Sequence, residues 1–188
     1  MAKVGNNIVT TGLSGKLGNL LVFRNRAGKT IVSQAPGERK GEWTDAQLKH
    51  RARFQEAIIY AKSAIADETT KEAYKTAADN GQSAFNVAVA DFMNAPHIDE
   101  IDMSSYTGEP GGYIQVRAVD DFQVAEVSVS ILNADGSEVE KGMAELVPGN
   151  SWWKYSATAK NDTLQNDKII IRVSDIPGNL TEMEKEIE

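Results

Sequence analysis

Cysteine is absent from the sequence, and histidine occurs only twice, at His50 and His97. Without cysteine the chain can form no disulfide framework, zinc-thiolate site or iron-sulfur cluster, and it has no thiol nucleophile. The two histidines are far apart in the sequence, and neither has a cluster of metal ligands or a nucleophile motif beside it. We therefore expect no catalytic, cofactor-binding or metal-binding residue, and we expect that the protein is not an enzyme.

Long apolar runs are also missing. No segment approaches the roughly 18 apolar residues of a membrane-spanning helix, and residues 1–7 do not lead into the apolar core of a signal peptide. We expect a protein that has no membrane partner and is made without Sec export. Its location would be cytoplasmic by default, while an extracellular or virion location by a non-Sec route stays open.

Charge is divided unevenly along the 188 residues, although the net charge is only −7. Residues 1–63 hold 11 Lys or Arg and 4 Asp or Glu, a balance of +7, so residues 64–188 carry 9 − 23 = −14. Surfaces of opposite sign attract each other when they come within the Debye length, about 8 Å at physiological ionic strength. The chain can therefore attract its own copies head to tail.

The first 43 residues form a glycine-rich zone with two β-prone runs. Residues 20–24 and 30–34 are rich in Leu, Val, Ile and Thr, and they flank a short loop that contains Gly28. This pattern predicts a β-hairpin. A hairpin alone is marginally stable in water, so this one must pack on other parts of the chain or on another molecule.

Residues 44–97 carry helical patterns. Thr44 and Gln47 have the spacing of a capping box, and an apolar stripe from Leu48 to Ile65 follows them. A second capping pattern at 69–72 predicts a helix that ends at Asn80 and Gly81, and an apolar third segment covers 83–93, before Pro96. We expect a three-helix bundle.

Residues 98–188 alternate between apolar and polar positions, as half-buried strands do. Turn signals containing Asp, Asn, Pro and Gly separate the candidate strands. Seven short strands in about 90 residues predict a Greek-key sandwich. They are centred on 114–118 and 127–131 and span 98–103, 139–147, 152–158, 168–173 and 180–187.

The final turn, Asp175-Ile176-Pro177-Gly178-Asn179, is similar to the last hairpin of bacterial immunoglobulin-like (Ig-like) domains. The front half resembles uncharacterised bacterial proteins with a glycine-rich N-terminal hairpin and helical region. That resemblance rests on 12–19, 22–24, Gly28-Lys29, Gln47, 51–54 and Ala57. It implies an architecture and no activity.

The expected fold class is therefore α+β in two modules. An N-terminal β-hairpin plus a three-helix bundle precedes a C-terminal seven-stranded Ig-like β-sandwich. The expected domains are a glycine-rich β-hairpin arm at 1–43, a helical bundle at 44–97 and an Ig-like β-sandwich at 98–188.

Calcium is the one cofactor that the sequence leaves open. Asp120, Asp121, Asp135 and Asp175 all fall in predicted turns between strands, and turn carboxylates are ligands that Ca²⁺ selects. Turns favour aspartate without any metal as well, so the pattern alone does not assign a site.

These features favour a non-enzymatic structural protein that forms homo-oligomers. In this hypothesis the basic N-terminal strands of one copy dock head to tail on the acidic sandwich of the next, giving a filament, a fibre or part of a larger particle. The candidate interface residues are Leu20, Val22, Arg24, Arg26, Lys29, Ile31, Arg39, Lys40, Trp152 and Trp153.

Two alternatives stay open. The Ig-like domain could act as a monomeric adhesion or ligand-recognition module through an exposed tryptophan at 152 or 153, because strand alternation sends one of them inward and the other outward. The basic residues between Arg24 and Arg53 could instead bind nucleic acid, but the acidic remainder would repel a polyanion, so we favour a protein interface. No small-molecule substrate is indicated.

Overall fold

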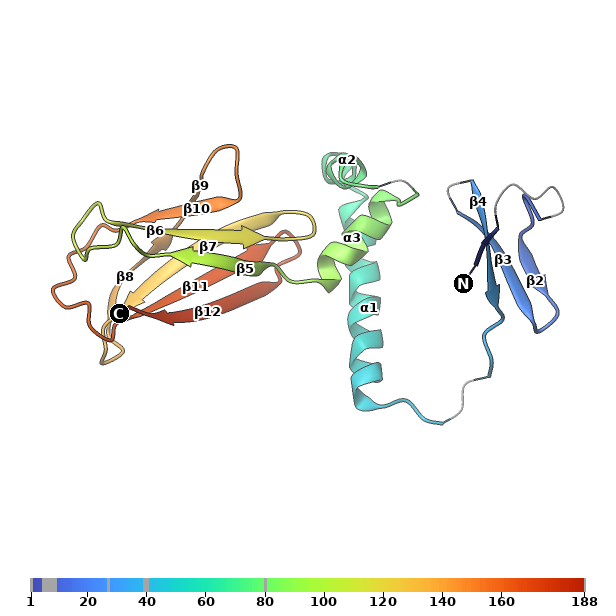
Figure 1. The fold of residues 1–188 in the computed structure, drawn as a ribbon, viewed down its shortest axis with the longest axis horizontal. Coiled ribbons are helices and arrows are strands. Elements are labelled where there is room, and N and C mark those ends of the chain that lie inside the picture. Colours follow the sequence, from blue (N-terminus) through green and yellow to red (C-terminus); the bar gives the residue numbers. More distant parts are fainter. Residues whose placement is uncertain (1, 5–9, 27, 39–40, 80, 188) are drawn as a thin grey trace. The chain divides into compact units, whose positions relative to one another are not determined.

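The computed structural model describes residues 2–4, 10–26, 28–38, 41–79 and 81–187 (Figure 1). It contains three helices and three four-stranded sheets, which confirms a mixed α+β chain. The residues group into two compact units, Met1–Ala52 with Ala78–Ser83, and Arg53–Ala77 with Ala84–Glu188. This division falls inside the first helix, whereas the sequence pattern predicts boundaries at 43/44 and 97/98.

The N-terminal sheet belongs to the first unit. Its strands are β1 (Ala2–Val4), β2 (Gly15–Leu17), β3 (Leu21–Arg26) and β4 (Lys29–Gln34), in the order β1-β4-β3-β2. Strands β3 and β4 pair antiparallel, which confirms the predicted hairpin. The flanking three-residue strands β1 and β2 were not predicted, because so short a segment carries no readable alternation.

The three helices are α1 (Asp45–Ala64), α2 (Glu68–Thr76) and α3 (Ala84–Met93). The capping box of α1 is confirmed, since the Thr44 amide donates to Gln47 Oε1 at 3.1 Å and the Gln47 amide donates to Thr44 Oγ1 at 3.3 Å. None of the helices in the described part of the chain is both long and apolar enough to cross a membrane.

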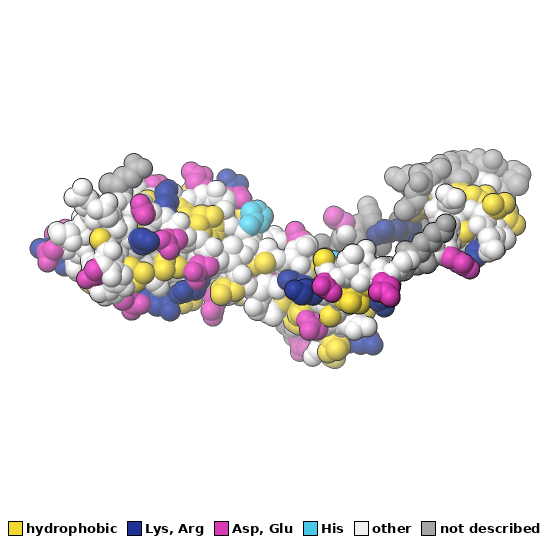
Figure 2. Space-filling model, turned by 90° about the horizontal axis from the view of Figure 1, so that it is seen from below, with side chains coloured by type: hydrophobic (Ala, Val, Ile, Leu, Met, Phe, Trp, Pro, Cys, Tyr) yellow, Lys and Arg dark blue, Asp and Glu magenta, His cyan; other side chains and the backbone are white. Residues whose placement is uncertain are grey.

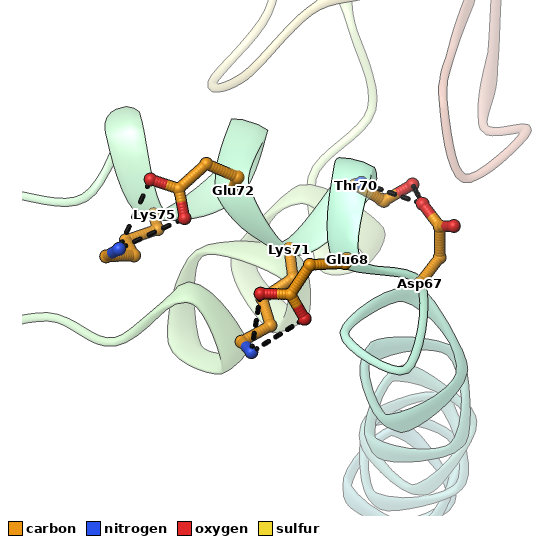
Figure 3. Close-up of polar contacts among 6 residues, drawn as sticks. All are labelled: Asp67, Glu68, Thr70, Lys71, Glu72 and Lys75. Carbon is orange, nitrogen blue, oxygen red and sulfur yellow. Dashed lines mark hydrogen bonds and ion pairs between the residues drawn. The ribbon is translucent and has the colours of Figure 1, made fainter.

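Helix α2 begins and ends earlier than predicted. Its N-cap is Asp67, which accepts a hydrogen bond from the Thr70 amide at 2.8 Å (Figure 3). The ion pairs Glu68–Lys71 and Glu72–Lys75 then stabilise its outer face. The predicted cap at 69–72 is wrong because Asp67 offers the same acceptor one half-turn earlier. The helix ends at Thr76, and Asn80 lies outside the described residues.

The helices share a small hydrophobic cluster built on Ala61, Tyr74 and Ala88, all fully buried. The apolar stripe predicted along α1 is buried only in its second half, where Ala57 and Ala61 are inaccessible. Leu48 and Phe54 keep 49% and 46% of their surface exposed, so the stripe is not continuous.

The rest of the second unit is a two-sheet region from His97 to Glu186. One sheet has the order β5-β6-β10-β9 and the other β12-β11-β7-β8. The strands are β5 (His97–Asp102), β6 (Tyr113–Val119), β7 (Val124–Leu132), β8 (Glu138–Met143), β9 (Glu145–Leu146), β10 (Trp152–Ser156), β11 (Lys168–Asp175) and β12 (Leu180–Glu186).

The predicted alternation is confirmed, and it supplies the main core. Along β6 the residues Ile114, Val116 and Ala118 are buried, and along β11 Ile169, Ile171 and Val173 are buried. These side chains meet those of β7 and Tyr155 in one hydrophobic cluster that receives residues from both sheets. The two sheets therefore pack face to face.

The single strand predicted at 139–147 is wrong, because the chain changes sheets within it. Strand β8 pairs with β7, whereas β9 pairs with β10 in the other sheet. Ala144 lies between them, is 6% exposed, and donates its amide to the Val127 carbonyl at 2.8 Å. The region consequently has eight strands rather than seven.

Replacing Ile171 by Ala should lower the free energy of unfolding by about 3 kcal/mol, because it leaves a cavity in the cluster between the sheets. The matched control is Ile59→Ala on α1, whose side chain is 69% exposed and should change stability by less than about 0.5 kcal/mol. Urea unfolding of the full chain measures both. Equal effects would contradict this placement of the core.

Candidate functional site

The N-terminal sheet has two unlike faces. Directly paired residues project to the same side of a sheet, and successive residues alternate. The register places Lys16 opposite Val22, Arg24 opposite Ile31 and Arg26 opposite Lys29. These six residues therefore share one face, which we call the basic face. It brings together five of the predicted interface residues: Val22, Arg24, Arg26, Lys29 and Ile31.

The opposite side, the apolar face, carries Leu17, Leu21, Phe23 and Val32. Leu17 is 62% exposed, and no residue of β2, β3 or β4 belongs to either hydrophobic cluster of the described residues. Thr30, in contrast, is buried and orders the end of the hairpin by donating to Asn25 Oδ1 at 2.9 Å. The sheet has ordered polar contacts but no hydrophobic core drawn from the described chain.

The other predicted interface residues fall elsewhere. Leu20 lies just before β3 and is 75% exposed, while Arg39 and Lys40 lie outside the described residues. Trp153 pairs with the buried Val116 and packs against the main cluster, whereas Trp152 pairs with Arg117 on the outer side. Both tryptophans are half-buried, so neither is a fully exposed surface contact.

A second candidate site lies where α3 meets the two-sheet region. Asp91 on α3, Asp120 after β6 and Asp175 at the end of β11 each place one carboxylate oxygen within 4.8 Å of the others. We call these three residues the carboxylate cluster. Asp91 is fully buried and Asp175 is 3% exposed, whereas Asp120 is half-buried. All three belong to the second unit.

Asn179 connects this cluster to the end of α3. Its side-chain amide donates to the carbonyls of Phe92 at 3.1 Å and Asn94 at 3.0 Å, and to Asp175 Oδ2 at 2.7 Å. Its Oδ1 accepts from the Arg53 guanidinium at 3.0 Å. Arg53 is thus occupied inside the unit, and this removes one cation from the basic set considered for nucleic acid.

The turn that resembles an Ig-like hairpin has a structural purpose here. Asp175 Oδ1 accepts from the amides of Gly178 at 2.9 Å and Asn179 at 2.6 Å. Gly178 has a φ of +92°, a backbone conformation that residues with a Cβ adopt rarely. The D-x-x-G-N pattern therefore positions both Asp175 and Asn179 for contact with α3.

Burial raises the pKa of Asp91 to about 7. The Tyr74 hydroxyl donates to Asp91 Oδ2 at 2.5 Å and lowers the pKa, but the negative charges of Asp120 and Asp175 raise it further. Tyr74 is also hydrogen-bonded to the Tyr60 hydroxyl at 2.8 Å. No ion pair among the described residues links a Lys or Arg to any member of the cluster. A proton or a cation is needed to neutralise it.

Two of the four turn aspartates for which the sequence left calcium open, Asp120 and Asp175, come together in this cluster. Asp135 caps its own turn by accepting from Ser137, and Asp121 accepts from Asn94. The sequence did not indicate Asp91, because helical periodicity places it in an apolar segment. It is the one charged residue in the helix Ala84–Met93, and this feature could have marked it as a candidate.

Stability should fall as pH rises through about 7 in chelator-containing buffer. The folded state holds the Asp91 proton up to about pH 7, whereas the unfolded chain releases it near 4, so the stabilisation is complete below 4 and lost above 7. Relative to Asp91→Asn, which stays neutral, the wild type should lose about 4 kcal/mol between pH 4 and pH 8. Urea unfolding at several pH values measures this difference, and a pH-independent difference would contradict it.

Replacing Asn179 by Asp should cost about 2–4 kcal/mol, because it removes the donor to the α3 carbonyls and adds a charge beside Asp175. Asn150→Asp is the matched control. Asn150 is exposed, and its side-chain oxygen accepts from the Trp152 amide, so an aspartate keeps this hydrogen bond. Thermal unfolding of both variants tests whether Asn179 contributes more than an ordinary turn residue.

A scan against protein families gives no match for this chain, and neither does a comparison with curated proteins. Among solved structures, the chain is similar to the crystal structure of an engineered protein from the Northeast Structural Genomics Consortium, with 14% sequence identity and a TM-score of 0.32. The similarity covers 57% of this chain and 29% of the engineered chain. The function of both candidate sites must therefore be argued from their own geometry and charge.

Proposed function

We propose that this chain is a non-enzymatic structural protein that assembles head to tail, with the N-terminal sheet of one copy docking on the two-sheet region of the next. The observation that carries the proposal is the N-terminal sheet, which has one apolar and one basic face and no hydrophobic core among the described residues. Hydrophobic side chains reach the surface of this sheet in Figure 2. An exposed amphipathic sheet gains stability by covering its apolar face.

Charge favours the two-sheet region of another copy as the partner. Strands β2, β3 and β4 hold four Lys or Arg and no Asp or Glu. Strand β5, an edge of one sheet, holds Asp99, Glu100 and Asp102 without any Lys or Arg, and β12, an edge of the other, holds three glutamates and one lysine. Two N-terminal sheets repel each other through their basic faces, whereas these edges attract them.

Local ion pairs limit the acidic surface. Glu182 pairs with Arg172, and Glu184 pairs with Lys168. Charges of both signs are accordingly interspersed over the face of the two-sheet region seen in Figure 2. The acidic groups best placed for a neighbour are therefore Glu100, Asp102 and Glu186. We assign the docking edge to β5 and β12.

We further propose that the two-sheet region is an Ig-like β-sandwich. If β5, β6, β7, β9, β10, β11 and β12 are lettered A to G, the sheet orders become A-B-E-D and G-F-C, with β8 added beside C. This is the strand order of Ig domains with one extra edge strand. Such sandwiches serve as building blocks in many surface and structural proteins, which fits an assembly role.

The full chain should form species larger than its 20.5 kDa monomer at low salt and dissociate toward the monomer in about 1 M NaCl, where the Debye length falls to about 3 Å. Arg24→Glu with Arg26→Glu should abolish assembly at low salt. Lys49→Glu with Lys62→Glu, the same charge change on exposed positions of α1, should leave it intact. Size-exclusion chromatography with light scattering measures the masses.

A monomeric wild type at high protein concentration in both salts would refute assembly. If both double variants lose assembly to the same extent, the effect comes from net charge in general and not from the basic face. Circular dichroism of each variant checks that the fold is retained.

A further inference from the structure

The carboxylate cluster presents two oxygens that the described chain leaves without a partner. Asp91 Oδ1 and Asp120 Oδ1 are both inaccessible, and neither accepts a hydrogen bond. Asp91 is 0% exposed, so water from the surface does not reach its side chain in this structure. Buried polar atoms are nearly always paired, and leaving one unpaired costs about 1–3 kcal/mol. The two oxygens therefore call for either a bound cation or a proton shared between them.

The surrounding groups also orient the cluster. Tyr74 fixes Asp91 through Oδ2, which leaves Oδ1 for another contact. The amides of Phe122 at 3.3 Å and Gln123 at 3.1 Å fix Asp120 through its Oδ2 in the same way. In both residues one oxygen is held by the protein and the other is free, within a cluster whose ligand oxygens lie within 4.8 Å of one another.

We propose that Asp91, Asp120 and Asp175 together bind one calcium ion where α3 meets the two-sheet region. The ligands are all oxygens, and His and Cys are absent from the cluster, which suits a hard cation rather than zinc or copper. A divalent ion also supplies the positive charge that the described Lys and Arg residues do not. Calcium takes six to eight oxygens in flexible geometry, so water completes the shell on the side of half-buried Asp120.

Such an ion would link three segments that are distant in sequence. Asp91 comes from α3, Asp120 from the connection between β6 and β7, and Asp175 from the end of β11. The ion would then fix the helices on both sheets at once, because β6 and β11 belong to different sheets. This stabilising role is independent of assembly through the N-terminal sheet.

The test uses the full chain, stripped with a chelator and dialysed, at pH 8. Calcium chloride at about 100-fold excess over its dissociation constant should raise the unfolding temperature by about 5–10 °C, and titration calorimetry should give one ion per chain. Asp120→Asn should lose this rise, since it keeps an acceptor for the Phe122 and Gln123 amides but removes the ligand charge. Asp135→Asn, the same change in a distant turn, should keep it.

The comparison is made within each variant, with and without calcium, so a less stable variant still gives a result as long as circular dichroism shows it folded. Magnesium chloride should give a smaller rise, because Mg²⁺ demands tighter octahedral geometry. No rise in the wild type at about 10 mM calcium, above the weakest class of natural sites, would overturn the proposal. An equal rise in the wild type and Asp120→Asn would also overturn it, since the ion would then bind elsewhere.

A proton shared between Asp91 and Asp120 is the competing explanation for the same two oxygens. It predicts that calcium has no effect and that Asp91→Asn is more stable than the wild type at pH 8 in every buffer. Calcium binding predicts instead that added calcium narrows this difference in stability, because only the wild type gains from the ion. A difference that calcium leaves unchanged favours the shared proton.

Discussion

Neutralising the buried carboxylates is the condition on which the packing of the helices against the two-sheet region depends. Asp91 and Asp175 approach each other from α3 and β11, and burial of two charges of the same sign is costly. The chain itself supplies hydrogen-bond donors to these carboxylates: Tyr74 donates to Asp91, and the amides of Gly178 and Asn179 donate to Asp175. Asn179 extends the same network to the α3 carbonyls and to Arg53. The helices and sheets of the second unit therefore meet through a polar contact as well as through the apolar cluster around Tyr74.

The N-terminal sheet differs, because its order comes from backbone pairing, while Leu17 is exposed and Leu21, Phe23 and Val32 are only half-buried. Strands β3 and β4 pair over six residues, and Asn25 and Thr30 join their ends. The hydrophobic clusters of the described residues lie entirely in the second unit, where they stabilise the two-sheet region and the helices. Covering the apolar face of this sheet would stabilise it by about 25 cal/mol for each Å² of apolar surface removed from water.

The sequence predicted the elements whose pattern is local and strong. The hairpin at β3 and β4, the capping box of α1 and the alternating strands around Val116 and Val129 were all recognisable. Two kinds of feature could not be predicted. The sheet change at Ala144 depends on which strands pair with β8 and β9. The start of α2 was ambiguous, because Asp67 and Thr69 are both common N-cap residues. The carboxylate cluster forms only through tertiary contact between α3 and two distant turns. The sequence therefore indicated Asp120 and Asp175, which lie in turns, but not Asp91, which lies in an apolar helix. Part of the basic face could be predicted, because Arg24 and Arg26 are two residues apart and so lie on the same side of a strand. Lys16 could not be assigned to it, because it joins this face only through the pairing of β2 with β3.

Burial also changes what the charge count of the sequence means. Residues 64–188 carry a formal −14, yet Asp91, Glu140, Asp167 and Asp175 are buried and contribute little to the surface that a neighbour meets. Glu182 and Glu184 are paired with cations of the adjacent strand. Exposed ion pairs contribute about 0–1 kcal/mol each, so the few remaining carboxylates at β5 and β12 can orient a basic sheet but cannot hold it alone. In the proposed assembly, covering the apolar face would supply the stability, and charge would select the partner. The acidic residues of the sequence thus fall into two groups: one lies at the surface, where the proposed assembly would use it, and the other lies inside the second unit, where its charge calls for a proton or a cation.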